Sequence, residues 1–151
     1  MIAADQKAFG TAREWYLKSL AIKEMQSDLH DAASTYFELG KVALNQQDFG
    51  AAQEWYLKSL AVWEKNGNRY GCAATYSELG ILASQKGSTE DCGKWFTRAV
   101  RIFLDAGDRN SADFTIKQLL FLYNQMSPED KSTIRAIWHA ADLGAFPEGS
   151  G

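Results

Sequence analysis

The sequence predicts an all-α fold, an α-solenoid of antiparallel helix pairs with about seven helices. The first 127 of its 151 residues contain no proline, so nothing there interrupts long helices. Blocks of sequence recur forty residues apart, which is the mark of a tandem array. Within each block, apolar residues follow one another at the three- and four-residue spacing of an amphipathic helix. A chain of this length makes one domain more readily than two.

The repeat is clearest in a block that stands near the N-terminus and again in mid-chain. Residues 11–22 read TAREWYLKSLAI and residues 51–62 read AAQEWYLKSLAV, with nine of twelve positions identical. A second block, DAASTYFELGKVALN at 31–45, matches GCAATYSELGILASQ at 71–85. Residues 91–102 form a weaker third copy of the first block. The chain is therefore expected to be an array of forty-residue units, each with a leading and a trailing helix.

Apolar spacing and capping residues set the expected helix bounds. The helices are predicted at 8–26, 29–45, 49–66, 69–86, 89–106, 109–126 and 128–142. N-cap residues are expected at Asp28, Asn68 and Asp108 before leading helices, and at Asp48, Ser88 and Ser127 before trailing ones. Ser88 with Asp91 resembles a capping box. Gly67 and Gly107 are expected to take the left-handed conformation that ends a helix.

These residues resemble the tetratricopeptide repeat family. The family pattern, aromatic-x2-Leu-Gly-x2-small followed by small-x3-aromatic-x2-small, matches two sets: Tyr36, Leu39, Gly40, Ala43, Ala52, Tyr56 and Ser59, and Tyr76, Leu79, Gly80, Ala83, Cys92, Phe96 and Ala99. The unit here is forty residues long, whereas the usual repeat of the family has about 34. In its length it resembles the long variant found in kinesin light chain, Pins-type adaptors and bacterial signalling arrays. The resemblance implies a right-handed superhelix whose concave face, lined by leading helices, binds partners.

The resemblance also suggests how the chain is organised. Residues 1–143 are expected to form a single array with a partial repeat at 8–27, full repeats at 28–67 and 68–107, and a degenerate capping repeat at 108–143. Residues 144–151 are expected to be a flexible tail. The first repeat lacks a leading helix, so the chain is expected either to be a fragment of a longer array or to self-associate. Self-association would cover an exposed edge at Trp15, Leu17 or their neighbours.

Composition and motifs argue against several classes of function. Sixteen basic and nineteen acidic residues give a net charge of −3, which disfavours general binding of nucleic acid. No apolar run approaches the roughly 18 residues of a membrane span. Cys72 and Cys92 lack metal-ligand spacing, and no P-loop, Gly-x-Ser-x-Gly or His-Glu-x-x-His motif occurs. The chain is predicted to be a cytoplasmic, non-enzymatic protein without metal, cofactor, nucleic-acid or membrane partner.

Single residues with possible chemistry have plain structural interpretations. Cys92 occupies the small buried position held by alanine in the other units, and Cys72 lies near a helix start. His30 and His139 are expected to be ordinary surface residues. Trp15, Trp55 and Trp95 recur at one site of successive trailing helices, either as inter-repeat packing or as an aromatic platform for a ligand.

A candidate peptide groove follows from the leading helices. Its predicted residues are Phe37, Lys41, Leu44, Asn45, Ser77, Ile81, Gln85, Phe114, Lys117, Phe121 and Gln125. The amides at forty-residue spacing could bond an extended peptide backbone, and the aromatic groups could supply apolar pockets. The alternative is that the amides are merely solvated and the apolar groups pack within the array. The clamp that chaperone-binding members use for a terminal carboxylate is not matched, since Phe37, Glu38, Lys41 and Glu78 stand at its places.

The function predicted is a non-catalytic scaffold that binds a peptide or helix in this groove, as part of a larger protein. The alternative is a self-association module that forms an oligomer or swapped dimer through the incomplete N-terminal edge. A third class, a sensor array that regulates an attached ATPase or protease domain, fits the long repeats but has no residue of its own to support it.

Overall fold

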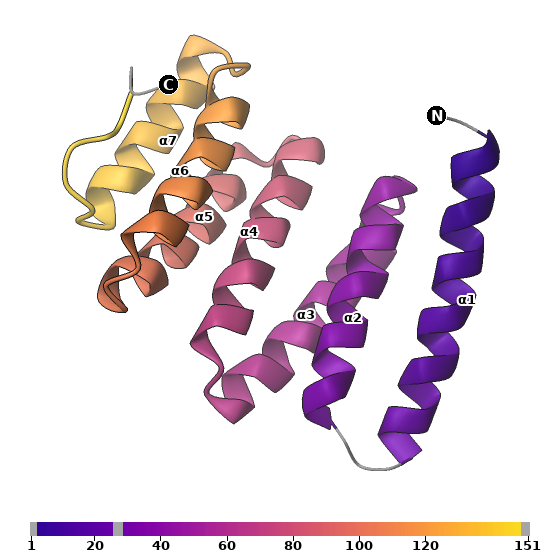
Figure 1. The fold of residues 1–151 in the computed structure, drawn as a ribbon. Helices are drawn as coiled ribbons and strands as arrows, with labels where there is room; N and C mark the ends of the chain where they lie inside the picture. The colour runs from indigo at the N-terminus through magenta and orange to yellow at the C-terminus, as the bar shows by residue number, and fades with distance from the viewer. Residues whose placement is uncertain (1–2, 26–28, 149–151) are drawn as a thin grey trace. The chain divides into compact units, whose positions relative to one another are not determined.

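The computed structural model describes residues 3–25 and 29–148, and the regular structure in these ranges is entirely α-helical (Figure 1). Its seven helices are α1 (Ala3–Met25), α2 (Leu29–Asn45), α3 (Phe49–Asn66), α4 (Arg69–Gln85), α5 (Thr89–Asp105), α6 (Arg109–Tyr123) and α7 (Pro128–Ala140). Short turns of the same kind join successive helices from α2 to α6, as a tandem array requires. The predicted all-α helical repeat fold is confirmed.

Three helix ends differ from the predicted bounds by more than one residue, and each has a local cause. Helix α1 begins at Ala3 rather than at residue 8, because the stretch AADQKA favours a helix. Helix α6 ends at Tyr123 rather than at 126, and the amide of Met126 bonds the Tyr123 carbonyl in a tighter turn. Helix α7 ends at Ala140 rather than at 142, where Asp142 adopts a left-handed φ of 57°.

The chain divides into two compact units, residues 1–71 and 72–151, and each is described by itself. In the first unit, the trailing helix α3 lies against the leading helix α2 through a close contact at Gly40. A Cβ atom at Gly40 would lie 2.5 Å from Cε1 of the buried Tyr56 ring. The Ser59 hydroxyl donates to the Ala33 carbonyl at 2.8 Å, and Tyr36 stacks on Trp55 with ring centroids 5.8 Å apart. Small residues thus let the two helices approach, as the repeat pattern predicts.

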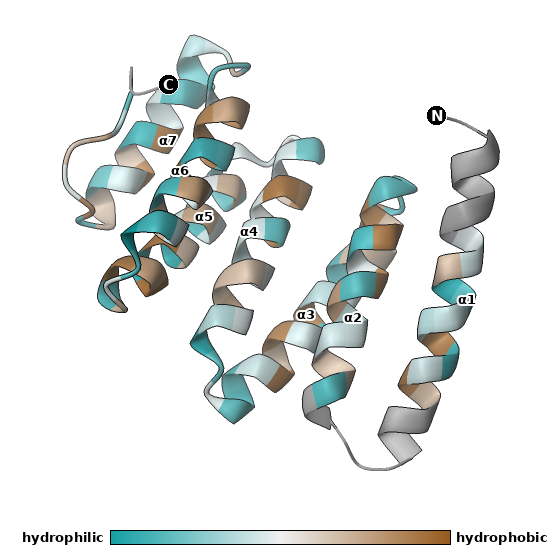
Figure 2. Cartoon of the chain, viewed as in Figure 1, coloured by the Kyte–Doolittle hydropathy of each residue, from teal (hydrophilic) through white to brown (hydrophobic). Residues whose placement is uncertain are grey.

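The second unit repeats this arrangement. A Cβ at Gly80 would lie 2.6 Å from Cδ2 of the buried Phe96, and Tyr76 stacks on Trp95 at 5.5 Å. Its buried core draws on four helices: Ala83, Cys92, Phe96, Val100, Leu119, Leu120, Tyr123, Ile134 and Trp138. Figure 2 shows hydrophobic residues along α5 and α6 in this unit.

The predicted caps are largely confirmed. The side chains of Asp48, Asn68, Asp108 and Ser127 each accept a hydrogen bond from the backbone amide three residues on. Ser88 differs: its hydroxyl donates to the Asp91 carboxylate at 2.9 Å and caps no amide. Asp28 lies outside the described residues. Gly67 and Gly107 are left-handed as predicted, with φ of 69° and 73°.

In the segment that was expected to be a flexible tail, Phe146 and Glu148 make defined contacts with α6 and α7. The Phe146 ring lies 4.8 Å from the Tyr123 ring and 5.5 Å from the Trp138 ring, centroid to centroid. The Tyr123 hydroxyl donates to Glu148 at 2.9 Å and accepts from Arg135 at 2.6 Å. The partly buried Phe146 ring thus adds apolar contact to the core of the second unit.

Candidate functional site

A hollow of about 510 Å³ lies between the leading helices α4 and α6 of the second unit. Its lining residues are Ile81 and Gln85 from α4, and Phe114, Lys117, Gln118, Phe121 and Leu122 from α6. We call this hollow the α4–α6 groove. Its volume falls within the range of about 300–1,000 Å³ that is usual for ligand sites, and apolar side chains dominate its walls.

One face of α6 forms most of the groove. Phe114, Lys117 and Phe121 are spaced at i, i+3 and i+7 on that face. The two phenylalanine side chains are 65% and 69% exposed, although their helix neighbours Leu119 and Tyr123 are buried in the core. Large aromatic side chains with this exposure on one face are typical of an interaction surface.

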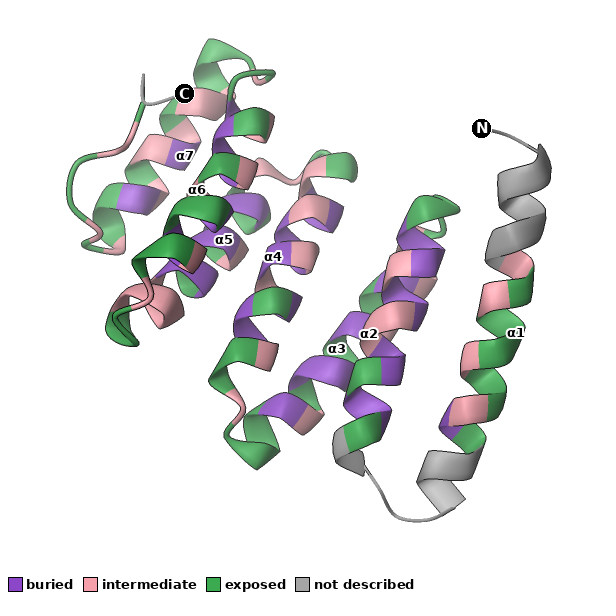
Figure 3. Ribbon diagram, in the orientation of Figure 1, coloured by how far each residue is buried: buried purple, intermediate pink, exposed green. Residues whose placement is uncertain are grey.

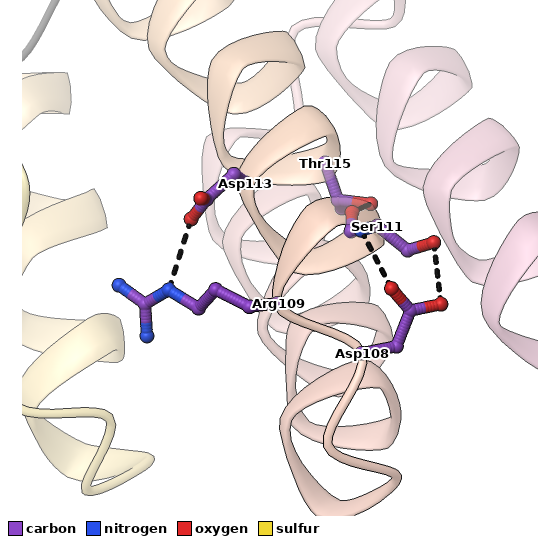
Figure 4. Close-up of polar contacts among 5 residues, drawn as sticks. All are labelled: Asp108, Arg109, Ser111, Asp113 and Thr115. Carbon is purple, nitrogen blue, oxygen red and sulfur yellow. Dashed lines mark hydrogen bonds and ion pairs between the residues drawn. The ribbon is translucent and has the colours of Figure 1, made fainter.

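The start of α6 is held in place by a polar network (Figure 4). The Asp108 carboxylate accepts from the Ser111 amide at 3.0 Å and from the Ser111 hydroxyl at 2.7 Å. The Thr115 hydroxyl donates to the Ser111 carbonyl at 2.9 Å, and Arg109 pairs with Asp113 at 3.2 Å. These bonds fix the first turns of the helix, so the exposed phenylalanines project from a rigid support.

The polar groups of the groove are a single ammonium and two amides. Lys117 forms no ion pair with any described residue, so its charge is available to a ligand. Gln85 and Gln118 stand on the two helices that flank the hollow, and each amide can both donate and accept. The groove therefore offers apolar contact, one positive charge and neutral hydrogen-bonding groups.

The equivalent stripe on α2, in the first unit, makes its contacts internally. The Phe37 ring lies 5.9 Å from the Tyr56 ring, and the Lys41 ammonium lies 5.6 Å from the Phe37 centroid and 4.0 Å from Glu38. Leu44 is buried, which corrects its expected place on the groove surface. Asn45 is exposed at the end of α2. Phe37 and Lys41 of this stripe therefore make their contacts within the first unit.

Two further predicted groove residues, Ser77 and Gln125, direct their side-chain hydrogen bonds to backbone carbonyls four residues earlier in the chain. Ser77 is buried, and its hydroxyl donates to the Ala73 carbonyl at 3.2 Å. The Gln125 amide donates to the Phe121 carbonyl at 3.0 Å, so the predicted row of amides is not a uniform set. Sequence reasoning missed Gln118 and Leu122. Gln118 follows Phe114 by four residues, a spacing that places it on the same helix face.

The predicted edge residues of α1 have different surroundings. Trp15 is 66% exposed, and its ring meets the neighbouring Tyr16 edge-on at 5.7 Å. Leu17 is 36% exposed, but its repeat equivalent Leu57 is 41% exposed within a complete helix pair. The exposure of Leu17 is therefore no sign that a neighbouring helix is missing. Trp15 differs from its repeat equivalents Trp55 and Trp95, because each of those two rings stacks on a tyrosine.

Among the side chains that the structure describes, those with possible catalytic or metal chemistry are not assembled into a site. Cys92 is fully buried, and burial raises the pKa of its thiol from 9.0 to about 12, so it is no nucleophile at neutral pH. Cys72 is also buried, and neither cysteine forms a disulfide bond. His139 is exposed near the end of α7, whereas the side chain of His30 lies outside the described residues. Among the described residues, no cluster of His, Cys, Asp and Glu could hold a metal ion.

None of the described helices combines the length and apolar character needed to cross a membrane. The helix pairs, their glycine–aromatic contacts and the groove on the leading helices define a helical-repeat protein. Residues 31–105 match the family model for the tetratricopeptide repeat. This part of the chain is therefore similar to tetratricopeptide repeats, and members of that family generally mediate protein–protein interaction. Comparison with curated proteins found no match.

Proposed function

We propose that the chain is a non-catalytic, cytoplasmic scaffold that binds a peptide or helix in the α4–α6 groove. The observation that carries the proposal is the pair of exposed phenylalanines, Phe114 and Phe121, on one face of a rigidly capped helix beside a hollow of about 510 Å³. The long form of the repeat and its place within a larger protein belong to the same proposal, supported by the forty-residue period.

The chemistry of the groove describes the ligand. Phe114 and Phe121 are two turns apart, a distance of about 10 Å along the helix. A ligand that contacts both rings therefore needs two apolar side chains about the same distance apart. Lys117 lies between them and favours a carboxylate on the ligand. Gln85 and Gln118 can satisfy a peptide backbone at the same place. A short segment with two apolar residues and an acidic residue between them fits these groups.

The test begins with selection from a random peptide library displayed against the full chain. Recovered peptides should share the apolar–acidic–apolar pattern. Phe114→Ser and Phe121→Ser should each weaken their binding by about tenfold or more, because an aromatic anchor carries a large share of binding energy. Both side chains are exposed, so the variants should remain folded. Lys117→Glu should shift the preference from acidic to basic peptides.

A matched control is available in the other unit. Trp15 is as exposed as Phe114, at 66% against 65%, but does not line the groove. Trp15→Ala should leave binding of the selected peptides unchanged. Peptides that bind the phenylalanine variants as well as the parent would exclude the groove as the site.

Self-association is a second candidate, favoured by the exposure of Trp15 on α1. In that case the chain should form an oligomer in light scattering at high concentration, and Trp15→Glu should dissociate it. A monomer at every concentration would exclude this candidate.

A further inference from the structure

The open face of α1 carries the same sequence as a face whose partner is present in the structure. Residues 9–12 and 14–21 of α1 repeat residues 49–52 and 54–61 of α3 with one change, Thr11 for Ala51. On α3, this sequence packs against the leading helix α2. We call the residues Ala12, Trp15 and Ser19, at i, i+3 and i+7 along α1, the α1 face.

Burial differs sharply between the equivalent positions. Ala52 and Ser59 on α3 are fully buried, as are Cys92 and Ala99 on α5. Their equivalents on the α1 face, Ala12 and Ser19, are only partly buried. Figure 3 shows the same contrast, since exposed and intermediate residues dominate the described part of α1, whereas α3 carries buried bands.

The partner that buries the equivalent faces is defined in both units. Trp55 stacks on Tyr36 at 5.8 Å, and Trp95 stacks on Tyr76 at 5.5 Å. Four residues after each tyrosine stands a glycine, Gly40 or Gly80, against which the trailing helix places a buried aromatic ring. In the first unit, the partner helix also provides the Ala33 carbonyl that accepts from Ser59.

We infer that the α1 face is a docking site for a helix of the leading type, with the pattern aromatic-x2-Leu-Gly, supplied by a partner polypeptide. The aromatic ring of the incoming helix stacks on Trp15, its glycine admits the Tyr16 ring, and a carbonyl one turn before the aromatic accepts from Ser19. This inference rests on the repeat geometry and not on the α4–α6 groove.

A second copy of the chain does not fit this role. Its two helices with the required pattern, α2 and α4, already hold the rings of Tyr56 and Phe96 against their glycines. The leading helix α6 carries Leu120 where the glycine stands in the others, and Leu120 is buried in the core. A folded copy therefore has no free helix of this type among its described residues.

The test uses a synthetic peptide with the sequence of α2, residues 29–45. Isolated helices of this length are marginal in water, so the peptide carries Ser34→Lys joined to Glu38 by a side-chain amide to hold the helix. Ser34 is exposed on α2, and the Glu38 side chain is 40% exposed. Titration of the labelled peptide with the full chain, followed by fluorescence anisotropy, should show saturable binding of one peptide per chain.

Two changes test the proposed contacts. Trp15→Ala should weaken the binding at least tenfold, because a stacked tryptophan is among the strongest anchors. A peptide with Gly40→Ile should also lose at least tenfold, since its side chain meets the Tyr16 ring. Isoleucine favours a helix more than glycine does, so this loss does not reflect lower helicity.

Leu57→Ala is the control, and it should leave peptide binding unchanged because this exposed residue of α3 lies outside the α1 face. No saturable binding of the parent peptide would overturn the inference. Equal binding to Trp15→Ala would also overturn it, because the peptide would then have replaced α2 on α3. A peptide-independent dimer that Trp15→Ala dissociates would assign the α1 face to self-association instead. The groove proposal is refuted by the Phe114 and Phe121 variants and not by the α2 peptide, so each proposal can be refuted without the other.

Discussion

The contact between Gly40 and Tyr56 gives the most direct test of how the helix pairs pack. Gly40→Ala places a Cβ atom 2.5 Å from Cε1 and 2.6 Å from Cδ1 of a ring that is fully buried. Carbon atoms pack at about 3.5–4.0 Å, so the ring or the helix must move by roughly 1 Å. Overpacking of this kind typically lowers the free energy of unfolding by about 1–3 kcal/mol.

Gly50→Ala provides the matched control. Gly50 also lies in a helix of the first unit, and outside the adjoining backbone of that helix no atom lies within 4 Å of the Cβ that would be added there. Alanine is preferred to glycine in helices by up to about 1 kcal/mol, and this gain applies to both variants. The difference between the two variants therefore isolates the steric term, about 1–3 kcal/mol in favour of Gly50→Ala.

The assay is urea unfolding followed by far-UV circular dichroism, supported by thermal midpoints. A change of 1 kcal/mol corresponds to about 2–4 °C in a chain of this size. Gly80→Ala should repeat the loss, because its Cβ would lie 2.6 Å from Phe96. If Gly40→Ala and Gly50→Ala proved equally stable, the close packing of leading and trailing helices would be refuted.

Three further predictions concern positions that the repeat allows us to compare. Gln47 has a left-handed φ of 61° where the next unit has Gly87 at 80°, so Gln47→Gly should raise the free energy of unfolding by about 1 kcal/mol and Gly87→Gln should lower it similarly. Equal and small effects of both changes in urea unfolding would contradict this. Asp108→Ala should cost about 1 kcal/mol by removing a cap, whereas Ser88→Ala, which caps no amide, should cost less in the same assay. The pKa of Cys92 is raised from 9.0 to about 12, so between these pH values the unfolded chain loses a proton that the folded chain keeps, and stability should fall as pH rises. Cys92→Ala should make that fall in a pH series of unfolding curves shallower, and an unchanged slope would exclude the thiol as its source.

The sequence predicted the helix pairs well because each forty-residue unit provides an independent copy of the same pattern. Agreement between copies identifies packing residues such as Gly40 with Tyr56 and Gly80 with Phe96. The helix ends were predicted less well where no copy exists. The turn after Tyr123 and the left-handed Asp142 depend on local backbone bonds that periodicity does not report.

The sequence could not indicate which of the predicted groove residues line a hollow, for a physical reason. Periodicity identifies which residues share a helix face, but burial depends on what the neighbouring helices place opposite that face. The Phe37 ring contacts the ring of Tyr56, and Leu44 is buried. These two residues of the stripe on α2 are therefore covered by side chains of their own unit. Phe114 and Phe121 stand at the same face of α6 without such cover, and this difference could be seen only in the structure.

The tail shows a related limit. Its composition, with glycine and proline near the end, is typical of irregular chain and gives no periodic signal. Phe146 nevertheless packs between Tyr123 and Trp138, because a single aromatic ring finds an apolar site on the cap. A contact made by one residue with no repeat equivalent is outside what self-comparison can predict.

The measurement that tests the central proposal most directly is amide chemical-shift mapping of the full chain with the tightest peptide from the library selection. Binding in the α4–α6 groove predicts the largest shifts at Ile81, Gln85, Phe114, Lys117 and Phe121, and their loss in Phe121→Ser. Shifts that cluster on other helices, while these residues stay unchanged, would contradict the assignment of the groove as the binding site.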